Sequence, residues 1–273
     1  MSVSNLAKRR GQILDEIMRF HREQLPKTMR EVPFENVRAM ASVAGPTTDF
    51  YGALKAPGVS LIAECKKASP SKGLLVPNYN PVKLARDYVK AGAQAISVLT
   101  DGRHFQGSLA HLRDVKEAVG AKTAVLRKDF IFHPYQVYEA RAAGADAILL
   151  IAAVLGEADM KELLALAHKL KMQVLIEVHT EEELAQVLPL EPHIVGVNNR
   201  NLQTFEVDFE NTARLRQLIP AAVAVVGESG LKSWEDVKAM QAIGVDAILV
   251  GESLVKSKDV YQAARMMVDA GRP

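Results

Sequence analysis

The sequence predicts one (β/α)8 TIM barrel, an α/β fold, with an extra N-terminal helical segment. Three observations indicate it: a motif that recurs along the chain, eight short apolar stretches that alternate with helical patterns, and polar residues that follow several of those stretches. Alternating strand and helix patterns without a second regime of composition are typical of a closed parallel barrel. We therefore expect a single domain over residues 1–273, with residues 1–50 as a helical extension packed on the barrel.

A six-residue motif occurs three times, as Ala91–Ile96 (AGAQAI), Ala143–Ile148 (AGADAI) and Ile243–Ile248 (IGVDAI). Each copy ends a helical pattern with a glycine, the residue favoured just beyond a helix C-terminus, and then opens an apolar strand. The three glycines are separated by 52 and by 100 residues. These gaps fit two and four strand–helix units of about 25 residues each.

The same spacing divides the rest of the chain into eight buried strands. They are expected at Val59–Cys65, Ala95–Leu99, Thr123–Arg127, Ala147–Ile151, Gln173–Val178, Ile194–Val197, Ala222–Val226 and Ala247–Val250. Helix starts between them carry capping chemistry. Asn80 precedes a first-turn proline, and Thr180 with Glu183 matches a capping box. Three further helix starts are expected at Ser108, Pro134 and Ser233.

The first fifty residues do not fit the repeat. Their apolar residues fall at near-helical spacing with charges between them, at Leu6, Ile13, Leu14, Ile17 and Met18. This periodicity predicts a packed helix that covers one end of the barrel. The alternative is a helix that also closes over the active site.

The composition excludes several classes of protein. Net charge is +2, and no basic run or basic–aromatic interleaving occurs, which argues against nucleic acid as a partner. The longest apolar run, Ala147–Leu155, is too short to span a bilayer. Cys65 is the only cysteine, so a disulfide framework is impossible and a reduced compartment is expected. Without a signal-peptide pattern, the cytoplasm is the expected location.

Cofactor motifs are also lacking. The seven histidines show no metal-ligand spacing, and no Gly-x-Gly-x-x-Gly follows a strand, so we expect neither a metal nor a cofactor. Ser229 has no His–Asp partner pattern for acyl transfer. A monomer is the default expectation, because no distinct association segment is visible.

Charged residues gather at the C-terminal ends of the predicted strands, where barrel enzymes place their sites. Alternation puts Glu64 and Lys66 on the inward face of the first strand. Lys128 follows the third strand and Glu177 ends the fifth. One such pair could simply plug the barrel mouth, but four charged groups are costly to crowd there for packing alone. The pattern therefore favours a catalytic cluster.

The ends of the last two strands form a second signal. Ser229-Gly230 and Gly251-Glu252 occupy the positions where barrels bind phosphate with loop amides and the N-terminus of a short helix. Tight turns are the alternative role for these glycines. We expect backbone amides, and not the Glu228 and Glu252 side chains, to face a phosphate. The long loop Lys67–Asn80 is either a mobile lid or a plain surface excursion.

Six motifs in order resemble those of indole-3-glycerol phosphate synthases. They are Ile62–Ser71 (IAECKKASPS), Thr100–Ser108 (TDGRHFQGS), Leu126–Phe130 (LRKDF), Ile176–His179 (IEVH), Val197–Leu202 (VNNRNL) and Gly227–Gly230 (GESG). The match runs from about Phe50 to Leu254, and the N-terminal extension is also a feature of that family. Two positions depart from patterns of some members: Ala68 is not basic, and Glu252 is not small.

The resemblance implies a carboxy-lyase of tryptophan biosynthesis. Its substrate would be 1-(2-carboxyphenylamino)-1-deoxyribulose 5-phosphate, which is ring-closed, decarboxylated and dehydrated to indole-3-glycerol phosphate. By analogy Lys128 is the general acid for ring closure. Lys66 would hold the substrate carboxylate and is a second candidate to protonate the departing hydroxyl. Glu177 would be the base for dehydration.

The remaining implied site residues bind or orient. Glu64, Glu228 and Asn198 would orient the catalytic groups and bind ribulose hydroxyls. Phe105 and Phe130 would line a slot for the anthranilate ring, with core packing as the alternative. The phosphate-side candidates are Ser69, Arg200, Ser229, Gly230, Gly251 and Glu252.

A lysine acid works best with a pKa lowered towards neutrality. We expect Lys66 near Lys128 to lower that pKa, with Glu64 and Glu177 limiting the drop. Three other functions compete. They are phosphoribosylanthranilate isomerase, a Schiff-base aldolase that uses a rim lysine as nucleophile, and a non-catalytic sensor of a phosphorylated ligand.

Overall fold

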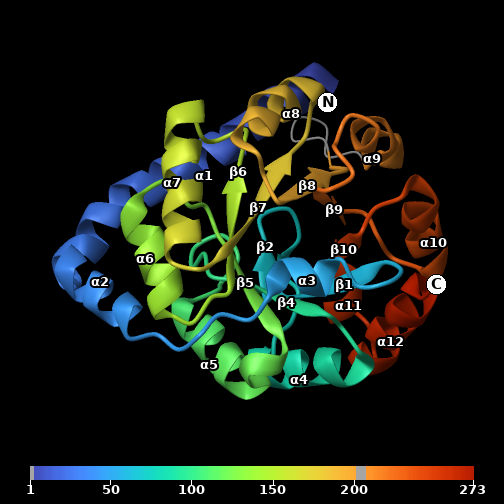
Figure 1. The fold of residues 1–273 in the computed structure, drawn as a ribbon, viewed down its shortest axis with the longest axis horizontal. Helices are drawn as coiled ribbons and strands as arrows, with labels where there is room; N and C mark the ends of the chain where they lie inside the picture. The colour runs from blue at the N-terminus through green and yellow to red at the C-terminus, as the bar shows by residue number, and fades with distance from the viewer. Residues whose placement is uncertain (1–2, 201–206) are drawn as a thin grey trace.

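A computed structural model describes residues 3–200 and 207–273, with side chains described from residue 13 onwards. Leu6 of the predicted apolar face and Asn201 and Leu202 of the fifth motif therefore fall outside the described parts. Eight parallel strands close into a barrel in sequence order (Figure 1). They are β1 (Ser60–Cys65), β4 (Ala95–Leu99), β5 (Ala124–Lys128), β6 (Ala147–Ile151), β7 (Gln173–Val178), β8 (Ile194–Asn198), β9 (Ala224–Glu228) and β10 (Ala247–Val250).

Helices alternate with these strands and surround them (Figure 1). They are α4 (Pro81–Ala91), α5 (Leu109–Val119), α6 (Pro134–Ala142), α7 (Glu157–Lys169), α8 (Glu181–Val187), α9 (Phe209–Arg216), α10 (Trp234–Ile243), α11 (Glu252–Val255) and α12 (Val260–Gly271). Two 3-10 turns, Gly120–Lys122 and Leu188–Leu190, follow α5 and α8. The loop after β1 folds back on itself as a short hairpin of β2 (Ala68–Ser69) and β3 (Gly73–Leu74).

The predicted barrel is confirmed, and its strands lie close to their expected bounds. The largest difference is at β9, which begins at Ala224 and not at Ala222. The cause is local: the Val223 N–H bonds to the Pro220 carbonyl at 3.0 Å, so the chain is still turning there. The strands are buried on both faces, as a parallel sheet covered by helices requires.

The expected helix starts are also confirmed, with one correction. Helices begin after Asn80, Ser108, His133, Thr180 and Ser233. The predicted reciprocal capping box at α8 forms on one side only. Thr180 Oγ1 accepts the Glu183 N–H at 3.2 Å, but Glu183 accepts the N–H of His179, at 2.6 Å, and not that of Thr180. The Glu183 carboxylate is therefore turned towards the end of β7.

The recurring motif has a structural role at the bottom of the barrel. Its three glycines have φ values of +99°, +88° and +84°, the left-handed conformation that ends a helix. Its polar fourth residue accepts the N–H of a residue near the start of the preceding barrel strand. Gln94 accepts from Leu61 at 2.7 Å, and the two aspartates accept from Val125 at 2.7 Å and Val225 at 2.8 Å. Each repeat thus links two neighbouring strands.

The N-terminal extension forms three helices, α1 (Val3–Glu31), α2 (Phe34–Ser42) and α3 (Phe50–Leu54). Phe50 and Leu54 are fully buried in the core cluster that fills the barrel from its N-terminal end. Helix α1 instead buries Ile17 at the opposite end, where this residue lines a cavity. The extension therefore covers both ends, where a helix over one end was expected. No helix in the described ranges is long and apolar enough to cross a membrane.

Candidate active site

A cavity of about 750 Å³ lies at the C-terminal ends of the strands. All of the predicted site residues line it: Glu64, Lys66, Ser69, Phe105, Lys128, Phe130, Glu177, Asn198, Arg200, Glu228, Ser229, Gly230, Gly251 and Glu252. The prediction that these side chains converge on one rim agrees with the structure. Their individual roles remain predictions.

Strand register brings the charged residues together. Glu177 on β7 pairs in register with Ile151 on β6, and Asn198 on β8 pairs with Glu228 on β9. Inward-facing side chains of neighbouring strands therefore stand at similar heights in the barrel. The Asn198 amide on β8 donates to Glu177 Oε1 at 3.2 Å, so β8 holds the carboxylate of the preceding strand, β7, in place.

Lys128 is the centre of the charged cluster. Its Nζ lies 3.1 Å from Glu228 Oε2 and 3.8 Å from the nearest oxygens of both Glu64 and Glu177. The side chain is 17% exposed, so these charges interact with little water between them. Lys66 is a second cation at the rim, with its Nζ 2.6 Å from Glu64 Oε1.

The expected lowering of the Lys128 pKa is wrong. Burial alone lowers this pKa, but three surrounding carboxylates raise it more, so it lies above the ordinary lysine value. Lys66 does not offset them, because its own charge is paired with Glu64. In the free site Lys128 is therefore a firmly protonated ammonium.

Glu228 has the pKa closest to neutrality in the cluster. Burial raises the pKa of this carboxyl, Lys128 opposes the rise and Glu177 adds to it, with a value of about 7. Its Oε1 is buried and has no hydrogen-bond partner in the described part of the chain. Gly196 makes room for it, since a Cβ there would collide with that oxygen. A glycine inside a strand is a sequence signal for such close approach, and the sequence prediction missed it.

The phosphate-side candidates surround the ends of β9 and β10. Ser229 and Gly230 have φ values of +68° and +86°, which turn the chain sharply after β9. Gly251 directly precedes α11. Glu252 points towards Lys256, with 2.5 Å between Oε1 and Nζ, so its carboxylate is already paired with a cation.

Three lysines that the sequence prediction did not include also line the cavity: Lys72, Lys232 and Lys256. They lie in or next to the loops that carry the phosphate-side candidates, so their position along the chain was the available signal. Ser69 Oγ is buried and makes no hydrogen bond to any residue that the structure describes. This side of the cavity therefore combines positive charge with an unused hydroxyl.

The opposite side of the cavity is apolar. The rings of Phe105 and Phe130 lie 6.4 Å apart, and Ile13, Leu14 and Ile17 of α1 complete the wall. The alternative prediction was an N-terminal helix that closes over the active site. The structure places three residues of α1 in the cavity wall, and closure itself stays a prediction.

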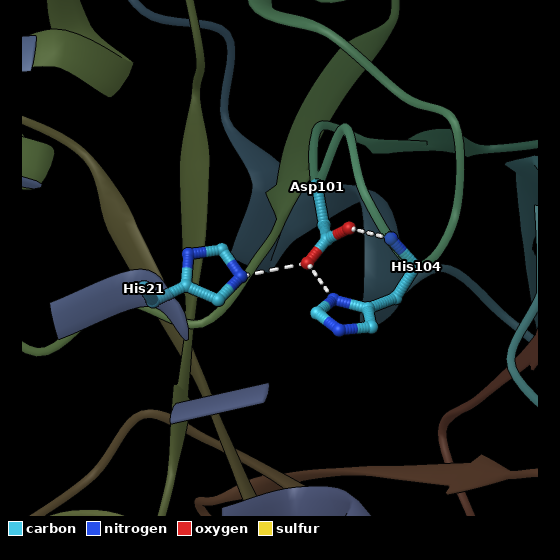
Figure 2. Close-up of side chains that lie close together, drawn as sticks. All are labelled: His21, Asp101 and His104. Atoms are coloured by element: carbon cyan, nitrogen blue, oxygen red, sulfur yellow. Dashed lines mark hydrogen bonds and ion pairs between the residues drawn. The ribbon is translucent and has the colours of Figure 1, made fainter. Parts of the chain in front are cut away.

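A hydrogen-bonded clamp holds α1 there (Figure 2). Asp101 Oδ2 lies 2.6 Å from His21 Nε2 of α1 and 2.9 Å from His104 Nδ1. The second oxygen accepts the His104 N–H at 2.5 Å, and the carboxylate is completely buried. Burial would raise the pKa of Asp101, but these hydrogen bonds hold it below its usual range. The sequence showed no sign of the clamp, because His21 is 80 residues from Asp101.

Comparison with known proteins identifies the family of the chain. The family profile for indole-3-glycerol phosphate synthase matches residues 14–267. A protein of that name from Dehalococcoides mccartyi is 46% identical over 258 residues, covering 94% of this chain and 100% of the relative. One from Roseiflexus sp. is 46% identical over 260 residues, covering 93% and 97%.

Solved structures agree on the fold at much lower identity. Thiamine phosphate pyrophosphorylase from Pyrococcus furiosus superposes with a TM-score of 0.60 at 16% identity, over 78% of this chain and 95% of the other. At that identity the likeness supports the barrel alone. The sequence relatives are much closer and span nearly the whole chain. The chain belongs to the indole-3-glycerol phosphate synthase family.

Proposed function

We propose that this cavity converts 1-(2-carboxyphenylamino)-1-deoxyribulose 5-phosphate to indole-3-glycerol phosphate, carbon dioxide and water. One observation carries the proposal: two lysines and three carboxylates meet between an apolar wall and a lysine-lined rim with sharp glycine turns. A substrate with an aromatic ring at one end and a phosphate at the other fits between these two sides.

Lys128 is the proposed acid for ring closure. An aromatic carbon attacks the substrate ketone, and the ammonium donates a proton to the oxygen on which negative charge develops. Its raised pKa in the free site makes it a poor donor until its carboxylate partners are engaged elsewhere. We propose that the ribulose hydroxyls hydrogen-bond to Glu64 and Glu228, which weakens the hold of these carboxylates on Lys128.

Lys66 and Glu177 are the proposed groups for the later steps. Lys66 projects into the cavity and pairs with Glu64, so it can hold the substrate carboxylate until carbon dioxide leaves. Glu177 is the proposed base for dehydration. Its lowered pKa keeps the carboxylate ionised at neutral pH, so it is free to accept a proton. Burial acts against this lowering, while Lys128, His179 and the Asn198 hydrogen bond favour it.

Binding is assigned to the two ends of the cavity. We propose that Phe105 and Phe130 hold the anthranilate ring against α1. The phosphate would lie among the amides of Ser229, Gly230, Gly251 and Glu252, with Ser69 and Arg200 as further candidates. Lys72, Lys232 and Lys256 add charge attraction. The positive charge of these lysines supports a phosphate site beside Ser69 and the glycine turns, even though the acidic Glu252 lies there as well.

The test is a fluorescence assay for indole-3-glycerol phosphate on wild type, Lys128→Ala and Glu177→Gln. We expect wild-type turnover and a loss of about a hundredfold or more in each variant. Exposed Lys169→Ala is the matched control, and thermal unfolding curves show whether each variant is folded. Undiminished turnover by folded Lys128→Ala would contradict the acid assignment. Lack of wild-type turnover would contradict the function.

Borohydride trapping tests the aldolase alternative. A Schiff-base enzyme would leave a covalent lysine adduct with a ketose phosphate after reduction, whereas the proposed mechanism leaves both rim lysines unmodified. The isomerase needs a single acid–base pair and does not account for two lysines and three carboxylates. A phospholigand sensor would bind without turnover.

The setting of the enzyme is also proposed and not observed. We propose that residues 1–273 act as one domain, because α1 and α3 cover the two ends of the same barrel. We further propose a cytoplasmic monomer without metal or cofactor, with other tryptophan-pathway enzymes as candidate partners. Gel filtration and crosslinking to those enzymes would test the association.

A further inference from the structure

His179 lies between two carboxylates just beyond the end of β7. Its Nε2 is 3.4 Å from Glu177 Oε1, and its Nδ1 is 3.3 Å from Glu183 Oε2. The side chain is only 7% exposed. Nε2 makes no hydrogen bond to any residue in the described ranges, so its ion pair with Glu177 is the polar contact that it has. The imidazole thus lies against the carboxylate proposed as the base and does not itself line the cavity.

Contacts from two helices hold this imidazole in place. Glu183 on α8 accepts the backbone N–H of His179 at 2.6 Å as well as contacting its ring. Asn211 on α9 donates to the His179 carbonyl at 3.1 Å and to the Asn198 carbonyl at 3.4 Å. The half-formed capping box of α8 is what makes this possible, because Glu183 turns away from Thr180. Both the backbone and the ring of His179 are therefore fixed.

We infer that His179 is a positioning residue: it keeps Glu177 in the ionised form that can accept a proton, and Glu183 holds His179 in place for that task. The inference rests on the proposed role of Glu177 as the base. His179 does not line the cavity, so it acts on the substrate only through Glu177.

Electrostatics agree with this geometry. Burial would lower the pKa of His179, but Glu183 and Glu177 raise it above the ordinary value. Two other titratable groups contribute around Glu177: Lys128 from β5 lowers its pKa, and Glu228 from β9 is a neighbouring carboxyl with a pKa of about 7. Two close carboxyls seldom ionise together. The imidazolium contacts Glu177 and not Glu228, so it favours a proton on Glu228 and a charge on Glu177.

The sign of the pH effect follows from this arrangement. A base works only when ionised, so turnover falls as the pH drops through the pKa of Glu177. Loss of a cation beside a carboxylate raises the carboxyl pKa, by roughly one unit for a single close neighbour. Replacing His179 should therefore move the acidic limb of the kcat–pH profile to higher pH, and activity should return towards the wild-type value at pH values above the shifted limb.

The experiment compares kcat–pH profiles of wild type, His179→Gln, Glu183→Gln and His168→Gln. We expect the acidic limb of His179→Gln to move up by roughly one pH unit. Glu183→Gln should move it less, since the imidazole remains. His168 stacks on His193 in another part of the molecule, and its replacement should leave the limb in place. A His179→Gln profile that is lowered equally at every pH, or not moved at all, would overturn the inference.

A second measurement does not depend on turnover. Carbon-13 NMR of glutamate-labelled protein gives carboxyl pKa values, and the Glu177 signal is identified by its loss in Glu177→Gln. An unchanged Glu177 pKa in folded His179→Gln would also overturn the inference. Failure of the proposed function has a different outcome, since the wild type would then lack turnover. Failure of the proposed base role alone would leave turnover in Glu177→Gln, whatever the effect of replacing His179.

Discussion

The buried position of Glu228 lowers the stability of the folded protein. Its carboxyl is buried beside two other carboxylates, and one of its oxygens lacks a hydrogen-bond partner among the residues that the structure describes. Gly196 makes the space for it. Groups that bind or orient a substrate are often held in such unfavourable positions, because the substrate supplies the missing contacts.

This cost predicts how stability depends on pH. The pKa of Glu228 in the folded protein is about 7, raised above its unfolded value of 4.5. A raised pKa in the folded state means that protonation of Glu228 favours folding. This contribution to the free energy of unfolding is fully present below about pH 4.5 and is lost as the pH rises through about 7. We expect Glu228→Gln to gain stability relative to wild type between about pH 5 and pH 8, by at least about 1 kcal/mol.

Urea unfolding of both proteins across this pH range measures the effect. The exposed Glu162→Gln on α7 is the matched control, and its difference from wild type should stay constant with pH. A constant difference for Glu228→Gln as well would show that Glu228 is not protonated near neutrality.

At the scale of elements, the clamp on α1 should affect substrate binding. The helix supplies Ile13, Leu14 and Ile17 to the cavity wall, and His21 holds it to the loop after β4. A hydrogen bond to a charged group contributes about 1.5–3 kcal/mol. We therefore expect His21→Phe to raise KM about tenfold or more, with a smaller change in kcat.

Steady-state kinetics at saturating and limiting substrate separate the two constants. Glu23→Gln changes an exposed residue of the same helix and should leave KM unchanged. Equal loss of kcat and unchanged KM in His21→Phe would contradict a role in binding.

Elements with regular patterns were predictable from the sequence, and contacts between distant elements were not. The strands alternate with capped helices, so their order and bounds follow from periodicity and local capping chemistry. The inward direction of Glu64 and Lys66 follows from alternation along β1. The raised pKa of Lys128 depends instead on side-chain distances across three other strands. The position of α1 depends on a contact between residues far apart in the chain.

At the scale of the whole molecule, the recurring motif links neighbouring strands around the bottom of the barrel. Asp146 is its most connected member: it accepts the N–H groups of Val125 and Thr48 and pairs with Lys116 at 2.6 Å. Replacement by alanine leaves the buried Val125 N–H without a partner. We expect Asp146→Ala to lower the free energy of unfolding by about 1–3 kcal/mol.

Urea denaturation followed by circular dichroism checks this value. The exposed Glu162→Ala serves as the control and should change stability by less than about 0.5 kcal/mol. An Asp146→Ala protein as stable as that control would mean that the repeat does not contribute to closing the barrel.

The placement of α1 has a consequence for how the enzyme is made. The helix leaves the ribosome before any strand of the barrel on which it packs. The hydrogen bond that holds it can form only after Asp101 has been synthesised, 80 residues after His21. Other residues that line the same cavity, such as Glu228 and Gly251, are synthesised later still. A helix that is translated before the barrel is thus among the last elements to dock. A nascent chain cannot complete its substrate pocket until the barrel has closed. We therefore expect activity only after these segments have been synthesised and folded.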